Sequence, residues 1–381
     1  MVDQDATIAL AKQLIEIDSV NPELVPGGAG EAAIAQFAAE WLSVRGFACR
    51  LLEQTPGRPS ILAIADGTGQ GTSIMLNGHL DTVALSSYEG KGLEPVERDG
   101  KLYGRGAYDM KSGVAAIMIA AAAAASRPHA GDIVVALVAD EEWASGGTAE
   151  VLRHIVTDCA IVVEPSGLDL VIAHRGFVWA NVTIHGTSAH GSRPDLGVDA
   201  IAKAGRFLTA IDHHGRQLAT SAPHPMLGTG SIHVSTISGG TEASTYPAEC
   251  SMVIERRTIP GEDDLTTERE LRGLLEQISS TDSEFRFDVQ VTAHRPPFAA
   301  ANDSVIAGVL ASSIEDFTGE SPLQRGEAFW TDCALLSAAG IDTVLFGVDG
   351  GGAHAASEWV SLASLDIVTA ALELAIVRAT S

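Results

Sequence analysis

SIMLNGHLDTV, residues 73–83, joins a short apolar run to a histidine and an aspartate. Similar runs recur along the chain as DIVVALVAD, AIVVEP and DTVLFGV, at 132–140, 160–165 and 342–348. Continuous Val, Ile and Leu runs are typical of central strands that are covered on both faces. Helix-like segments accompany them at 31–45, 112–126 and 148–155. The sequence therefore predicts an α/β domain with a mixed, largely parallel sheet.

The pattern changes from about Gly176 to Ala293. Here FVWANVTIHG, SIHVSTISGG, ECSMVIERRT and FRFDVQVTAH alternate apolar and polar residues, and helices are predicted over 198–213 and 265–279. The resulting order, βαββαβ, is that of a ferredoxin-like α+β fold with an open antiparallel sheet. We therefore expect a discontinuous first domain over residues 1–175 and 294–381, interrupted by a second domain over residues 176–293.

Composition narrows the class of protein. The net charge of −25 and the pI near 4.7 argue against a nucleic-acid partner, because a phosphate backbone is held by clustered Lys and Arg. The longest apolar stretch, Val114–Ala125, is shorter than the roughly 20 residues of a membrane span and is expected to be a buried helix.

The cysteines and the amino terminus bear on the compartment. The four cysteines form no CxxC pair, so they indicate neither a disulfide framework nor a cysteine-zinc site. MVDQDATIALAKQLIEI, at the amino terminus, reads as an amphipathic helix and not as a secretion signal. We expect a cytoplasmic protein without a membrane partner.

Side chains that can bind metal ions follow the apolar runs. In open α/β sheets, ligands gather outside the carboxyl ends of the strands. The candidates at these positions and in the glycine-bracketed turn GRGAYDMKSG are His79, Asp81, Asp109, Asp140, Glu141, Glu142, Glu164 and His354. Their convergence would create a site crowded with acids, which cations would relieve.

Each candidate also has a plain structural interpretation. A lone HxD pair such as His79 and Asp81 is a weak signal, and Asp109 could merely cap the helix that begins near Ser112. The three acids at 140–142 could be a solvated loop, and a single histidine such as His354 is more often a surface residue. The joint pattern favours the metal site.

The chemistry of the donor set points to particular metals. Two histidines and three carboxylates suit zinc and would tolerate cobalt or manganese. Two divalent ions that share one carboxylate are the economical arrangement. A spare glutamate beside the ligands can then take a proton from a metal-activated water.

The chain resembles the metallopeptidase family that holds acetylornithine deacetylase, succinyl-diaminopimelate desuccinylase, carboxypeptidase G and aminoacylase. The motifs that carry the resemblance span nearly the whole chain in family order: GHLDTV, GRGAYDMKSG, DEE, VVEPSG, SAHGSRPDLGVDAI and GGGAHAASEWV. The resemblance implies a catalytic metal-binding domain at 1–175 and 294–381, and an insertion at 176–293 that acts as a lid and pairs subunits into a homodimer.

The same resemblance implies roles for individual residues. His79, Asp109 and Glu164 would hold one metal ion, and Asp109, Glu142 and His354 the other. Glu141 would act as the general base, and Asp81 would orient the His79 imidazole.

Three residues of the insertion match functional positions of the family or depart from them. His190 would help to stabilise the oxyanion of a neighbouring subunit's site, although it could also be a turn residue near the dimer contact. Arg257 would bind a substrate carboxylate, and it faces the opposite side of its strand from Arg256. Ser244 stands where many relatives have asparagine, which puts the polar contact there in doubt.

These observations predict a hydrolase that removes the acyl group from an N-acyl amino acid. A carboxypeptidase or dipeptidase of the same family would use identical metal chemistry on a short peptide. A non-catalytic binding protein with this fold and a dinuclear phosphoesterase are alternatives of other classes. Retention of the base and of all five ligands disfavours the former, and the insertion and the motifs disfavour the latter.

Overall fold

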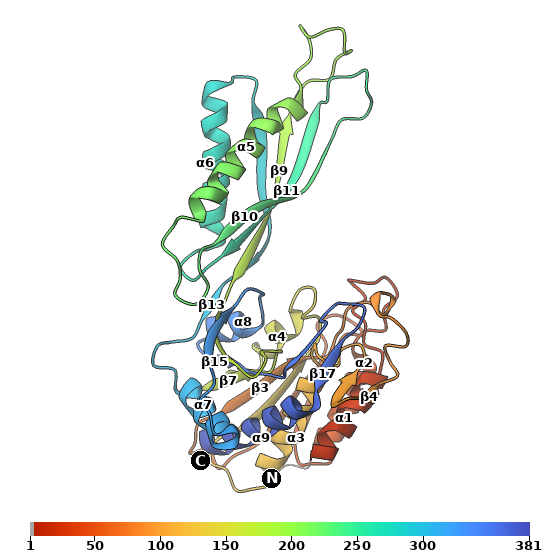
Figure 1. The fold of residues 1–381 in the computed structure, drawn as a ribbon, viewed down its shortest axis with the longest axis vertical. Coiled ribbons are helices and arrows are strands. Elements are labelled where there is room, and N and C mark those ends of the chain that lie inside the picture. The colour runs from red at the N-terminus through yellow and green to blue at the C-terminus, as the bar shows by residue number, and fades with distance from the viewer. Residues whose placement is uncertain (1–3) are drawn as a thin grey trace. The chain divides into compact units, whose positions relative to one another are not determined.

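A computed structural model describes residues 4–381, which divide into two compact units. Of the described residues, the first unit comprises 4–172, 300–325 and 331–381, and the second comprises 173–299 and 326–330. The chain thus leaves the first unit, builds most of the second and returns, as the colours in Figure 1 trace. No pattern in the sequence assigns residues 326–330 to the second unit.

The larger sheet has nine strands in the order β1-β2-β6-β3-β7-β15-β8-β13, with β14 paired to β8. The strands are β1 (Ala48–Leu52), β2 (Ser60–Ala65), β3 (Ile74–His79), β6 (Ile133–Val138), β7 (Cys159–Val162), β8 (Leu170–His174), β13 (Phe298–Ala299), β14 (Gln324–Glu327) and β15 (Asp342–Leu345). The central strands β6, β3, β7 and β15 run parallel. Antiparallel pairs flank them. The predicted mixed sheet is confirmed, but the expectation of a largely parallel sheet is wrong, because only the four central strands run parallel and the flanking strands pair antiparallel.

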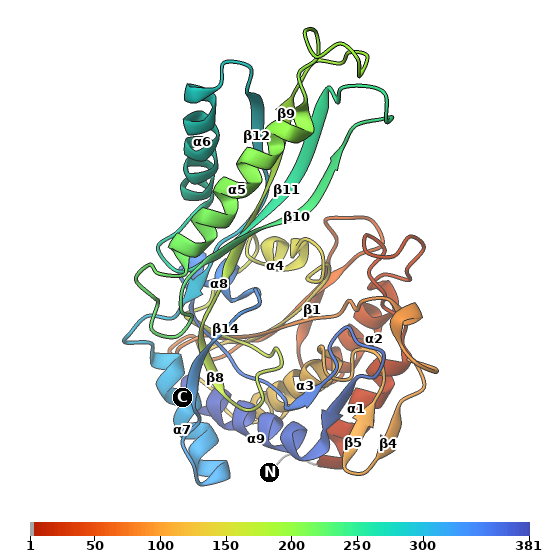
Figure 2. The same ribbon diagram turned by 45° about the horizontal axis from the view of Figure 1, so that its top comes forward.

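Helices cover this sheet because its central strands are apolar on both faces. They are α1 (Gln4–Glu16), α2 (Ala32–Ser43), α3 (Lys111–Ala125), α4 (Gly146–Val151), α7 (Val305–Thr318), α8 (Cys333–Ala338) and α9 (Leu362–Ala379). Figure 2 shows α1, α3 and α9 side by side, and α3 contacts both of the others as well as β3 and β6. None of the helices among the described residues is long and apolar enough to cross a membrane.

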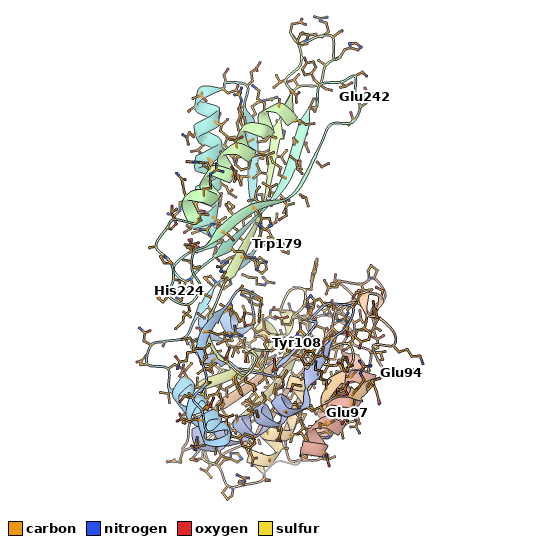
Figure 3. All side chains as sticks on the ribbon, in the orientation of Figure 1. Glu94, Glu97, Tyr108, Trp179, His224 and Glu242 are labelled. Atoms are coloured by element: carbon orange, nitrogen blue, oxygen red, sulfur yellow. The ribbon has the colours of Figure 1, made fainter. Side chains whose placement is uncertain are left out.

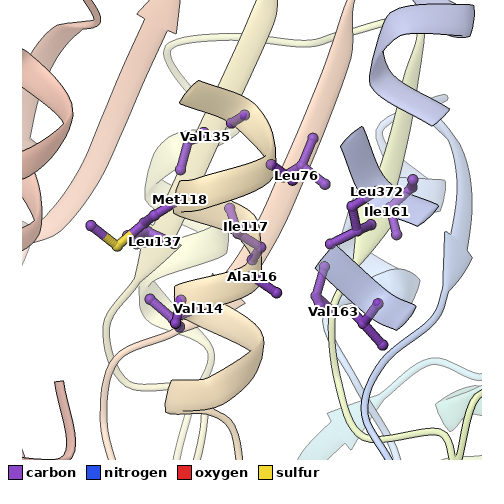
Figure 4. Close-up of a cluster of buried hydrophobic side chains, with 14 of the residues drawn as sticks. Leu76, Val114, Ala116, Ile117, Met118, Val135, Leu137, Ile161, Val163 and Leu372 are labelled. Atoms are coloured by element: carbon purple, nitrogen blue, oxygen red, sulfur yellow. The ribbon is translucent and has the colours of Figure 1, made fainter. Parts of the chain in front are cut away.

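The alanine-rich helix α3 lies at the centre of the hydrophobic core. Its small side chains let it approach the sheet closely, and Ile117 and Met118 are fully buried. Figure 4 shows the α3 side chains beside Leu76 of β3 and Leu372 of α9. Burying a side chain of this size contributes roughly 1.5–3 kcal/mol. This packing fixes the strand ends that carry the polar residues of the site.

A small antiparallel sheet in the first unit has the order β16-β17-β5-β4. Its strands are β4 (Val96–Arg98), β5 (Lys101–Tyr103), β16 (Gly350–Gly351) and β17 (Trp359–Ser361). Trp359 pairs with Tyr103, so the segment after β5 and the segment before β17 lie next to each other although some 250 residues separate them. Both segments carry residues of the candidate site.

The second unit follows the order β9 (Gly176–His185), α5 (Ala200–Leu218), β10 (Ser231–Gly239), β11 (Glu249–Thr258), α6 (Asp264–Thr281) and β12 (Arg286–Arg295). Its four strands form an antiparallel sheet in the order β10-β11-β9-β12. Asp199 and Asp263 cap α5 and α6, each accepting a backbone N–H three residues along. The unit has its own core, in which Phe207 and Leu271 are fully buried.

Candidate active site

His79 ends β3 and is 2% exposed. Its Nδ1 lies 2.9 Å from the carbonyl oxygen of Asp81. Because a carbonyl oxygen only accepts hydrogen bonds, Nδ1 carries the hydrogen, and Nε2 faces the acids. Nε2 lies 3.0 Å from Oδ1 of Asp109 and 3.5 Å from Oε1 of Glu164. The ring is thus oriented in the manner of a metal-binding histidine.

Asp109 stands between two histidines. Its Oδ1 faces His79, and its Oδ2 lies 3.3 Å from Nε2 of His354. The His354 Nε2 is also 3.1 Å from Oε2 of Glu142. A carboxylate whose two oxygens face different imidazoles has the geometry needed to bridge two cations.

Local backbone geometry places these side chains. His354 has a φ of 60°, which is uncommon for a residue other than glycine. Gly352, two residues earlier, has a φ of 81°, and a Cβ there would lie 1.9 Å from the carbonyl oxygen of Ser357. The glycine-rich turn after β15 is therefore required for the tight loop that carries His354.

The cluster is electrostatically crowded. Burial raises the pKa of Glu164 to about 8, and burial together with the charge on Glu164 raises the pKa of Glu141 well above its usual range. Hydrogen bonds to Asp109 and Glu142 raise the pKa of His354 to about 10. Buried carboxylates that crowd one another in this way need positive charge, which divalent cations would supply.

Among the described residues, two groups of side chains could each hold a metal ion. Ligand atoms lie within 4.8 Å of one another in two groups, His79–Glu141–Glu164 and His79–Asp109–Glu142. These groups differ from the predicted division, which put Glu141 outside both metal ions and gave the second ion His354 in place of His79. The side chains of His79, Asp109, Glu142, Glu164 and His354 lie within 3.5 Å of at least one other member of the set, and their imidazole and carboxylate donors fit zinc-type ions.

The Asp81 carboxylate has a different partner from the one expected. Its Oδ1 is 3.6 Å from Nδ1 of His79, whereas the Asp81 carbonyl oxygen makes the short contact. The carboxylate instead accepts the backbone N–H groups of Glu141 and Glu142, at 3.1 and 3.2 Å. Asp81 therefore orients the imidazole through its backbone and the two glutamates through its side chain.

His190, Arg257 and Ser244 belong to the second unit. His190 is exposed, and its Nδ1 lies 2.8 Å from Oγ of Ser192. The carbonyl oxygen of Ser244 accepts the N–H of Gly191, so Ser244 lies beside the His190 turn.

The two adjacent arginines of β11 differ in burial. Arg256 is 1% exposed and pairs with Glu262 and Glu270 under the helices. Arg257 is on the other face, where its Nε donates to Oε1 of Glu255 at 2.6 Å and its guanidinium lies 5.2 Å from the centre of the Phe177 ring. Figure 3 labels Trp179, whose indole N–H donates to the same Glu255.

Glu358 is a site residue that sequence reasoning did not identify. It is 1% exposed, and its carboxylate accepts the backbone N–H groups of Gly106, Tyr108 and Asp109 and a bond from Arg105. Figure 3 labels Tyr108 in this turn. Glu358 thereby fixes the turn that carries Asp109.

Asp332 is a second residue of the site that was not predicted from the sequence. It is 2% exposed, and it accepts a hydrogen bond of 2.5 Å from Thr148, which in turn accepts one from Asn77. Its charge acts on Glu141 and Glu164. Glu358 is marked in the sequence only by its position four residues after His354, and no pattern in the sequence marks Asp332.

Comparisons with known proteins show which family the chain resembles. Residues 75–378 match the model of peptidase family M20/M25/M40. Acetylornithine deacetylase of Myxococcus xanthus is 29% identical over 321 residues, which cover 80% of each chain. Succinyl-diaminopimelate desuccinylase of Halorhodospira halophila is 29% identical over 395 residues, which cover 96% of each.

Solved structures share the fold. An aminopeptidase from Bacillus cereus matches with a TM-score of 0.83 at 19% identity and covers 100% of this chain and 99% of its own. A dinuclear metal-binding peptidase of family M20 from Bacillus subtilis matches with a TM-score of 0.76 at 16% identity, covering 99% of both.

Proposed function

This chain belongs to peptidase family M20/M25/M40 and is a hydrolase of amide bonds, from which we propose that it removes the acyl group from an N-acyl amino acid with the help of two divalent metal ions. The family expected from the motifs is thereby confirmed. Two of the relatives are named as a deacetylase and a desuccinylase, which supports a small acylated amino acid as the substrate.

One observation carries the proposal: the two oxygens of the Asp109 carboxylate face His79 and His354, with Glu164 and Glu142 beside them. In this proposal His79, Asp109 and Glu164 hold one ion, and Asp109, Glu142 and His354 hold the other. Zinc is the proposed metal, with cobalt or manganese as substitutes. Bound there, the two ions would polarise the scissile carbonyl and acidify a water molecule.

Glu141 is the proposed general base. A carboxylate oxygen of Glu141 lies within 4.8 Å of ligand atoms of His79 and Glu164, and its backbone N–H donates to the Asp81 carboxylate. In the proposed reaction one Glu141 oxygen accepts a proton from the attacking water and then passes it to the leaving amine nitrogen. The products are the free amino acid and the carboxylate of the acyl group.

The second unit would supply the remaining contacts. We assign oxyanion stabilisation to His190 and substrate-carboxylate binding to Arg257, both of which are accessible on their unit. A bidentate guanidinium–carboxylate contact would require Arg257 to exchange Glu255 for the substrate or to bind both. The unit is further proposed to act as a lid and to pair two chains through its open sheet, where Ile237 is 52% exposed.

The first prediction tests the role of Glu141. Glu141→Gln keeps the size of the side chain but removes the proton acceptor, so turnover of N-acetyl and N-succinyl amino acids should fall by at least about 100-fold. Zinc content, measured by atomic spectroscopy, should stay near that of the wild type.

Glu97→Gln is the control, because Glu97 is an exposed partner of Lys12 and should leave turnover unchanged. Substantial activity in Glu141→Gln would remove that residue from the role of base. Dipeptides belong in the same substrate panel, because the wild type cutting only these would favour a dipeptidase instead.

A further inference from the structure

A buried polar network lies behind the loop that carries Glu141 and Glu142. At its centre is Arg58, just before β2, with 7% of its surface exposed. Its guanidinium grips both oxygens of Glu31, with Nη2–Oε1 at 2.5 Å and Nε–Oε2 at 2.9 Å. The remaining terminal nitrogen, Nη1, donates to Oδ1 of Asp140 at 2.8 Å. Arg58 therefore joins the start of α2 to the end of β6.

The network continues from Asp140 to the site. The side-chain amide of Asn21 donates to Oδ1 of Asp140 at 3.2 Å and to Oδ2 of Asp81 at 2.7 Å. Asp81 in turn holds the backbone of Glu141 and Glu142.

As a result, three consecutive backbone N–H groups, those of residues 140–142, donate to buried carboxylates. The N–H of Asp140 donates to Oε1 of Glu31 at 3.1 Å, and the next two N–H groups donate to the Asp81 carboxylate. Asp140 also has a φ of 67°, a left-handed conformation that costs a non-glycine residue about 1–2 kcal/mol. The side-chain contacts of Asp140 hold this turn in place, and the turn sets the direction in which Glu141 and Glu142 leave the strand.

Arg58 is the residue of this network whose replacement should have the largest effect, because it carries the positive charge. The network contains the carboxylates of Glu31, Asp81 and Asp140, and Arg58 is the cation that the described contacts place among them. Removing one partner of a buried ion pair leaves the others uncompensated. A lysine has a single ammonium group and cannot reproduce the planar fork that reaches Glu31 and Asp140 together.

We propose that Arg58, Glu31, Asn21 and Asp140 are positioning residues that aim Glu141 at the substrate water and Glu142 at its metal ion. This inference rests on the proposed function, because it assigns those tasks to the two glutamates. Outer residues of this kind, when altered, typically cost about 10- to 100-fold in activity or metal affinity.

The test compares Arg58→Lys with Arg378→Lys. Arg378 also forms an ion pair in the first unit, with Asp316 on the helix pair α7–α9, and contacts none of the site residues named above. Arg58→Lys should lower kcat by about 10- to 100-fold with KM changed less than about 3-fold. Zn²⁺ titrated into the metal-free protein should show one of the two equivalents weakened about tenfold or more and the other unchanged.

Arg378→Lys should match the wild type in both measurements. If Arg58→Lys had the kcat and both zinc affinities of the wild type, the network would not position the two glutamates, and the inference would be overturned. A wild type that binds no zinc and cleaves no substrate would instead defeat the proposed function.

Two variants of Asp140 keep the experiment decisive if Arg58→Lys does not fold. Glycine and asparagine both tolerate a φ of 67°, but only asparagine keeps an oxygen that can accept from Arg58 and Asn21. Asp140→Gly should therefore lower kcat and weaken one zinc equivalent, and Asp140→Asn should retain most of both. Equal behaviour of Asp140→Gly and the wild type would overturn the inference.

Discussion

Glu358 is the buried acid on which the Asp109 turn depends. Its carboxylate accepts from Arg105 at 2.7 Å and from the N–H groups of Tyr108 and Asp109 at 2.9 and 3.0 Å. In Glu358→Gln the amide nitrogen would replace one of the two oxygens and face its donors, and Arg105, 1% exposed, would lose its counter-charge. We expect a loss of about 3–5 kcal/mol in the free energy of unfolding of the metal-free protein, measured with denaturant.

Glu97→Gln provides the matched comparison for that measurement. Its ion pair with Lys12 is exposed, so its loss should cost less than about 1 kcal/mol. If the two variants were equally stable, Glu358 would have no special part in holding the turn.

Residues at strand ends could be predicted, and residues that hold them could not. His79 and Glu164 each follow a buried apolar run, which marks the end of a strand in the sequence itself. Arg58 and Glu358 have no such mark, because their partners are set only when distant segments meet. Arg105 and Glu358 are 253 residues apart, and Arg58, in the loop before β2, is 27 residues from Glu31 at the N-cap of α2.

Helix α3 offers a prediction at the scale of an element. Replacing a helical glycine by alanine usually stabilises a helix by up to about 1 kcal/mol. At Gly113, however, a Cβ would lie 2.5 Å from the carbonyl oxygen of Val163, next to Glu164. Gly113→Ala should therefore destabilise the protein by about 1–3 kcal/mol in thermal unfolding and weaken zinc binding.

Gly308 of α7 is the control, because a Cβ there would meet no atom within 4 Å. Gly308→Ala should leave stability unchanged or raise it by up to about 1 kcal/mol. Stabilisation by both substitutions would show that α3 can move away from the sheet without cost.

Some helices and strands could be predicted from the sequence, and others could not. The apolar runs gave the four parallel strands because such strands are buried on both faces, and the alternation over 176–293 matched β9 to β12. The small sheet was missed because β16 has two residues and β4, β5 and β17 have three each, too few to show a period. The antiparallel strand pairs at the two sides of the large sheet were not predicted, because their pairing depends on connections that no local pattern encodes.

At the scale of the whole molecule, the metal ligands and the core of the second unit are separate. The five candidate ligands all belong to the first unit, whereas Phe207 and its neighbours form a core within the second. A ligand stabilises only the part of a protein that must be folded to bind it. Zinc should therefore act on the first unit alone.

Calorimetry of the full chain tests this. Zinc at about 100 times its dissociation constant should raise the stability of one transition by about 2.7 kcal/mol and leave the other in place, and a chelator should reverse the shift. Phe207→Ala removes a fully buried ring and should lower only the zinc-insensitive transition, by about 3–5 kcal/mol. If zinc and Phe207→Ala both moved every transition together, the two units would unfold as one cooperative structure, and the second unit would have to owe part of its stability to the first.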